Sequence, residues 1–147
     1  MLFWVSVVAL AVIAALGWNL YLRVGASRID AIANKRRATS RTVSSGEFVD
    51  GNRHVKVALA LTGTDLFYEN ADMKAYLDLH WVQEVEYDTC LATGQEAEGG
   101  KVLRIRCYSQ VFEFILPGKV VPTWYLMLPP RRAIDIPPAA LPVPAAI

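Results

Sequence analysis

The first 22 residues are almost entirely hydrophobic and carry no charge, whereas polar and apolar residues alternate through much of the remaining chain. About 20 apolar residues in a helix span the ~30 Å hydrocarbon core of a bilayer, and residues 3–22 have that length. Trp18 and Tyr21 stand near one end of the run, where aromatic rings favour the membrane interface. We therefore predict a transmembrane helix over residues 1–22.

A cleaved signal peptide is the alternative interpretation of this run, and Val24-Gly25-Ala26 would serve as its cleavage site. Signal peptides have a basic N-terminal region and a shorter apolar core. No Lys or Arg precedes the apolar run here. The sequence therefore favours a retained anchor.

Residues 23–41 contain six basic residues and one acidic residue, and we expect a helical stalk there. Basic residues mark the cytoplasmic side of an anchor, and each contributes about 1 kcal/mol beside anionic lipid. Val24, Ile29 and Ile32 are too sparse to predict a packed helix face. We predict an N-terminus outside the cell and a cytoplasmic domain on a plasma-membrane anchor. The predicted membrane-surface contacts are Arg23, Arg28, Lys35, Arg36, Arg37 and Arg41.

From residue 42 the apolar period changes to two, which is typical of half-buried strands. In residues 55–61, for example, Val57, Leu59 and Leu61 fall on one face, and Ala58 falls on the other with its polar neighbour Lys56. Turn signals separate the segments. The predicted strands are 47–49, 55–61, 66–68, 75–79, 82–87, 102–108 and 111–116.

Apolar spacings of three and four in residues 119–128 predict a short helix that carries Trp124 and ends at Pro129-Pro130. Residues 131–147 are rich in Pro and Ala, which predicts a disordered tail. We therefore expect one domain over residues 42–130, of the α+β class and mainly β. Its seven antiparallel strands would close into a barrel or stack as a sandwich.

The order of these elements over residues 44–128 resembles the pleckstrin-homology-like superfold, which includes GRAM-type and bacterial PH-like domains. The residues that carry this resemblance are the turn at 61–68, Trp81-Val82-Gln83-Glu84-Val85, the acidic hairpin loop at 92–100, Val102-Leu103-Arg104-Ile105, Phe112-Glu113-Phe114 and the terminal helix. In that family seven strands form two near-orthogonal sheets, and a C-terminal helix closes one open end. The resemblance implies that Trp124 is the core plug and that the chain is a single-pass bacterial membrane protein.

The resemblance also leads to two functional hypotheses. The first is a scaffold or interaction module that takes a segment of an unknown protein partner on an exposed strand edge, or in the groove beside the terminal helix. The second is a lipid-binding or lipid-sensing domain. Phosphoinositide-binding members resemble one another in a basic cluster, of which this chain offers Arg53, His54 and Lys56. The predicted contacts to anionic head groups are Arg53, Lys56, Arg104 and Arg106.

Charge and cysteine content narrow the classes of partner. Residues 42–132 contain nine basic and twelve acidic residues, so the domain lacks the basic face that nucleic acid requires. Cys90 and Cys107 are expected to be free thiols in a reducing cytoplasm. They would become a candidate disulfide if the domain faced the outside.

No catalytic or metal-binding constellation stands out in the sequence. His54 and His80 are the only histidines, and neither has the spacing of a metal ligand. Glu84 and Glu86 share one strand face. A solvated strand surface is a commoner explanation of this pattern than a catalytic carboxylate pair. We therefore expect a protein that is not an enzyme and needs no cofactor. An activity lost in Glu84→Gln or His80→Ala would indicate an enzyme instead.

Overall fold

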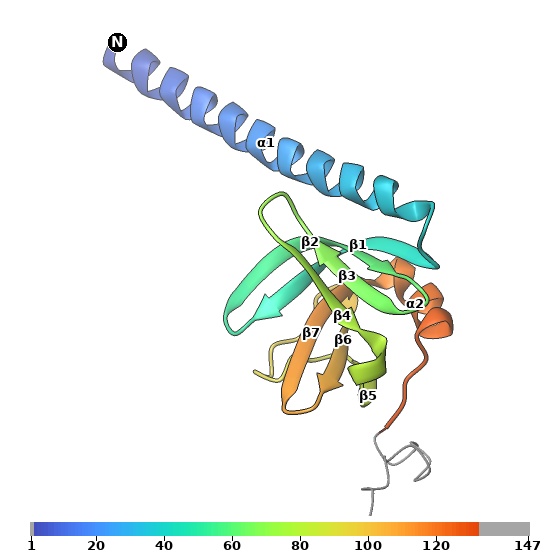
Figure 1. Ribbon diagram of the computed structural model, residues 1–147. Coiled ribbons are helices and arrows are strands. Elements are labelled where there is room, and N and C mark those ends of the chain that lie inside the picture. The colour runs from blue at the N-terminus through green and yellow to red at the C-terminus, as the bar shows by residue number, and fades with distance from the viewer. Residues whose placement is uncertain (1, 133–147) are drawn as a thin grey trace, which may run out of the picture.

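A computed structural model describes residues 2–132 of the chain, with side chains from Val7 onward (Figure 1). A long helix leads into an all-antiparallel sheet, and a short helix follows the sheet. The elements are α1 (Leu2–Arg37), β1 (Thr42–Asp50), β2 (Arg53–Leu61), β3 (Asp65–Glu69), β4 (Lys74–Asp78), β5 (Glu84–Asp88), β6 (Gly100–Cys107), β7 (Gln110–Pro117) and α2 (Val121–Met127). Short 3-10 turns cover Leu79–Trp81 and Gly118–Val120.

The seven predicted antiparallel strands are confirmed, and they form one open sheet in the order β4-β3-β2-β1-β7-β6-β5. The sheet curls so that both halves face a shared interior (Figure 1). Side chains from β2 to β7 and from α2 make up this largest core cluster, with Leu77 as the buried contribution of β4. The inward face of β2 is the one predicted, since Val57, Leu59 and Leu61 are fully buried.

The two halves of the sheet meet at β1 and β7, which pair over only three positions, from Glu47 opposite Ile115 to Val49 opposite Glu113. Gly46 stands where the two strands begin to part. A Cβ there would lie 2.9 Å from the carbonyl oxygen of Ile115, so a side chain would force the strands apart. The first half of β1 therefore pairs with β2 alone and leaves one end of the core to be closed by another element.

Helix α2 closes that end of the core through Trp124, which is fully buried. Its indole Nε1–H donates to Ser44 Oγ at 2.9 Å. The Tyr87 hydroxyl donates to the carbonyl oxygens of Trp124 at 3.0 Å and Leu128 at 2.8 Å, which ties the helix to β5. Burial raises the pKa of Tyr87 well above its ordinary value, so this hydroxyl stays protonated and able to donate.

Helix α1 is long and apolar enough to cross a membrane, and no side chain from residue 7 to residue 28 is buried. Its last three turns do not form a free stalk. Ile29 and Ala33 pack on Ala58, on the outer face of β2, and form a second small core with Ile32 and Val43 beside it. The prediction that this segment lacks a packed face is therefore wrong. Small alanines on both partners let the helix approach the sheet closely.

Other predicted boundaries also need correction. The first strand, predicted over 47–49, spans Thr42–Asp50. Leu79 does not end a strand, because the chain turns into a 3-10 helix there, with the Asp78 carboxylate accepting from the His80 N–H. Arg131 is not part of a tail. Its backbone exchanges two hydrogen bonds with Val85, at 2.9 and 3.0 Å, so the folded domain extends at least to this residue. The predicted disorder of residues 133–147 lies outside the described residues.

Candidate functional site

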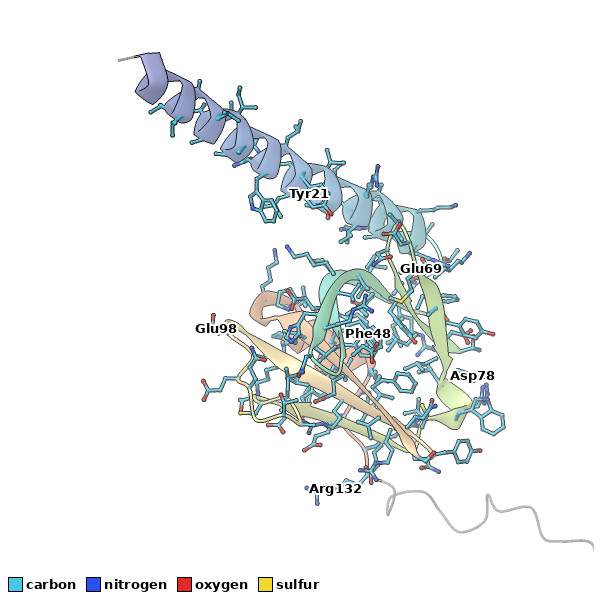
Figure 2. The ribbon with its side chains drawn as sticks, turned by 90° about the vertical axis from the view of Figure 1, so that its left-hand side faces the viewer. Tyr21, Phe48, Glu69, Asp78, Glu98 and Arg132 are labelled. Atoms are coloured by element: carbon cyan, nitrogen blue, oxygen red, sulfur yellow. The ribbon has the colours of Figure 1, made fainter. Side chains whose placement is uncertain are left out.

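The junction between α1 and the sheet fixes how the domain sits against this helix. Arg36 of α1 holds Glu69 of β3 through two hydrogen bonds, Nε to Oε2 at 3.0 Å and Nη2 to Oε1 at 2.5 Å. The guanidinium also lies 4.0 Å from the ring centroid of Phe67. The hydrogen bond to Glu69 raises the pKa of Arg36 against the opposing effect of burial. Figure 2 shows Glu69 directly beside the end of α1.

This junction changes the roles predicted for the basic stalk. Arg36 is engaged with Glu69 and is not a lipid contact. Lys35 and Arg37 share the last turn of α1 with Arg36, whereas Arg41 follows the helix in the link to β1. Arg23 and Arg28 lie nearer the apolar half of the helix. Membrane-surface contact stays a prediction for these five residues.

The four predicted lipid contacts in the domain do not come together. Arg104 and Arg106 lie on β6, whereas Arg53 and Lys56 lie on β2, and two strands separate β2 from β6. Arg106 pairs with Glu84 at 3.0 Å. In the part of the chain that is described, neither Arg53 nor Lys56 takes part in an ion pair.

Arg104 is the centre of a cross-strand charge network and is not free to bind lipid. Its guanidinium lies 3.0 Å from Glu86, 3.1 Å from Asp88 and 3.2 Å from Glu113, and its side chain is only 19% exposed. Burial lowers the pKa of Arg104, but the three carboxylates raise it by more. The hydrogen bond from Arg104 lowers the pKa of Asp88 in turn. The acids of β5 thus have a structural use, because Arg104 and Arg106 hold Glu84, Glu86 and Asp88 in ion pairs.

A cleft of about 630 Å³ opens between α1, the outer face of β1 and β2, and the loop before β6. Asp30 comes from the helix, while Glu47 and Lys56 face each other across the β1–β2 pair. His54 Nδ1 contacts Glu47 at 3.3 Å. Ala26, Ile29 and Asp30 line the cleft from α1, so the cleft lies directly beside the helix.

Strand β4 forms a free edge of the sheet and pairs with β3 alone among the described strands. At the end of this ladder Leu79 N–H donates to the Thr64 carbonyl. Because bonded positions alternate in an antiparallel pair, the backbone groups of Lys74, Tyr76 and Asp78 point away from β3. The Tyr76 side chain is 62% exposed. The opposite edge, β5, is partly covered by Arg131.

The remaining candidates from the sequence are separate surface features. His80 is exposed and bonded to Asp78, and this pairing lowers the pKa of Asp78 through the backbone and side chain of His80. Trp81 is 55% exposed and stacks on Tyr108 with ring centroids 5.5 Å apart, so it is not a core residue. Among the residues described, no three His, Cys, Asp or Glu side chains are grouped to hold a metal ion.

Cys90 and Cys107 are free thiols. Cys90 lies two residues beyond Asp88, the last residue of β5, which pairs with Val102 near the start of β6, whereas Cys107 ends β6. Five residues of strand separate those two positions, about 16 Å, and a disulfide needs Cα atoms closer than ~7 Å. A disulfide between Cys90 and Cys107 of the same chain is therefore excluded, whether the domain faces the cytoplasm or the outside.

Sequence reasoning identified neither the cleft nor the specific free edge. Both depend on strand order and on how α1 lies against β2, and period-two patterns carry no information on either. Comparison of the chain with protein-family models, with curated proteins and with solved structures finds no match.

Proposed function

We propose that this chain is a non-enzymatic, single-pass membrane protein whose PH-like domain acts as an interaction or scaffold module at the inner face of a bacterial plasma membrane. The strand order, the curled sheet and the short helix that buries Trp124 in the end of the core support a PH-like domain. The basic residues that follow the anchor support the inner face. The occupied acids of β5 support a role other than catalysis.

The observation that carries the interaction role is the open β4 edge. Unpaired N–H and C=O groups on an edge strand accept an extended segment of another protein as an additional strand. The exposed Tyr76 ring and the opposite charges of Lys74 and Asp78 add side-chain selectivity along that segment. Since Arg36 and Ile29 fix the domain on α1, the edge keeps one position relative to the bilayer.

A Tyr76→Pro substitution is expected to abolish partner binding without unfolding the domain. It removes an N–H that points away from β3, and proline is tolerated on edge strands. We would place a photoreactive amino acid at Lys74 in the full-length protein and irradiate intact cells. The expected result is discrete protein adducts that fall to background in the Tyr76→Pro variant.

Two controls sharpen this experiment. Tyr76→Ala keeps the outward N–H and should retain the adducts at reduced yield. A photoreactive residue at Tyr125, an exposed ring on α2, should not give the same adducts. Adducts that survive Tyr76→Pro, or that form equally from position 125, would contradict binding at the β4 edge.

Lipid binding is a second candidate function, and the position of the cleft favours it. Ala26 and Asp30 line the cleft about 6 and 12 Å beyond Leu22 along α1, which is the depth of lipid head groups and the water beside them. Any group bound there meets the domain and the bilayer surface together. The charges of the cleft then decide which head group fits.

A further inference from the structure

The cleft beside α1 has an unusual charge for a lipid site. Its lining contains four carboxylates, Asp30, Glu47, Glu96 and Glu98, and one ammonium group, Lys56. A purely anionic head group would meet a net negative lining and be repelled. A head group with a cationic end and one phosphate would find a partner for each of its charges.

We propose that this cleft binds the head group of an aminophospholipid, with its phosphate at Lys56 and its primary ammonium between Asp30 and Glu47. This inference rests on the lipid-binding candidate above and identifies its ligand class. Glu47 and Lys56 are directly opposite each other on β1 and β2, and Asp30 lies above them on the helix. The two signs of charge are thus placed close together, as they are in the ligand.

The groups that carry the proposal are available for a ligand. Within the described residues neither Asp30 nor Lys56 forms an ion pair, and both side chains belong to exposed residues. The Lys56 ammonium carries three donors for phosphate oxygens, and a primary ammonium carries three donors for carboxylates. Among the described residues His54 competes for Glu47, since its Nδ1 contacts a single oxygen of Glu47 at 3.3 Å.

The chemistry predicts discrimination among three common head groups. Ethanolamine presents N–H donors to Asp30 and Glu47. Choline carries the same charge but has no N–H, so it loses the charge-assisted hydrogen bonds. Glycerol has no cation and brings the phosphate charge alone. The expected order of binding is therefore phosphatidylethanolamine above phosphatidylcholine above phosphatidylglycerol.

The test is native mass spectrometry of the full-length protein in detergent with equal amounts of these three lipids, which differ in mass. We expect phosphatidylethanolamine adducts to exceed phosphatidylcholine adducts about tenfold, the scale of one hydrogen bond to a charged group. Asp30→Asn and Glu47→Gln should each reduce that ratio toward one. Lys56→Gln should lower the binding of both lipids and leave the ratio unchanged.

Asp72→Asn is the matched control, because it makes the same chemical change at an exposed residue in the β3–β4 turn, outside the cleft. It should leave the ratio as in the wild type. Equal binding of all three lipids, a preference for phosphatidylglycerol, or a ratio that persists in Asp30→Asn and Glu47→Gln would overturn the proposal. Protein adducts at position 74 are read separately, so loss of lipid selectivity and loss of edge binding are distinguishable.

Discussion

Replacing Trp124 with alanine is expected to lower the free energy of unfolding by about 3 to 5 kcal/mol. The free energy of unfolding of a small domain is about 5 to 15 kcal/mol in total, so the substitution removes a large part of it. The indole is fully buried at the end of the core, where β1 and β7 part. Its removal leaves a cavity and leaves the Ser44 hydroxyl without its donor. It also loosens the turn of α2 whose carbonyls accept from Tyr87.

The measurement is urea unfolding of the full-length protein in micelles, followed by near-ultraviolet circular dichroism. Ser44→Ala should have a smaller effect of about 1 to 3 kcal/mol, because it leaves the buried indole N–H without an acceptor. Leu126→Ala is the control on the same helix, and its 78% exposure predicts a change within about 0.5 kcal/mol. A Trp124→Ala variant as stable as Leu126→Ala would show that α2 does not complete the core.

Replacing Arg36 with alanine is expected to release the domain from α1 and to reduce stability by about 3 kcal/mol. Glu69 is 6% exposed, and its buried carboxyl group would lose its partner. Removing one member of a buried pair costs about 3 to 5 kcal/mol, and the lower value applies because the Arg36 side chain keeps 23% exposure. The few apolar contacts around Ile29 and Ala33 cannot replace this bond.

Spin labels at Ala31 on α1 and at Asp50 on the β1–β2 turn would report this release, in a background without Cys90 and Cys107. The wild type should give one narrow distance distribution, and Arg36→Ala should give a broad one. Arg37→Ala removes the same charge one residue away at an exposed position and should stay narrow. A narrow distribution in Arg36→Ala would mean that other contacts fix the domain.

The strands could be predicted because their information is local. Alternation in β2 placed Val57, Leu59 and Leu61 on the core face, and the spacing around Trp124 indicated a helix with one buried face. The fold class follows from counting such segments. Single-residue boundaries were less accurate where a side chain competes with the strand, as Asp78 does by capping the turn at Leu79.

The junction and the cleft could not be predicted, because they depend on pairs that are distant in sequence. Arg36 and Glu69 are 33 residues apart, and nothing local in a basic stalk distinguishes the one arginine that is paired. The alanines at positions 33 and 58 look neutral in a hydrophobicity pattern, yet their small size permits close packing. Likewise, the carboxylates that pair with Arg104 lie beside it only because of the registers between β5, β6 and β7.

We propose that a retained anchor holds the folded domain at the cytoplasmic surface, and protease protection in spheroplasts tests this topology most directly. We expect the domain to stay in the membrane fraction, to resist protease added outside, and to be cleaved only after the membrane is permeabilised. Cleavage in intact spheroplasts would reverse the orientation. A domain that leaves the membrane fraction, shortened near residue 26, would show that residues 1–22 are a signal peptide, and would remove the basis for a lipid site beside α1.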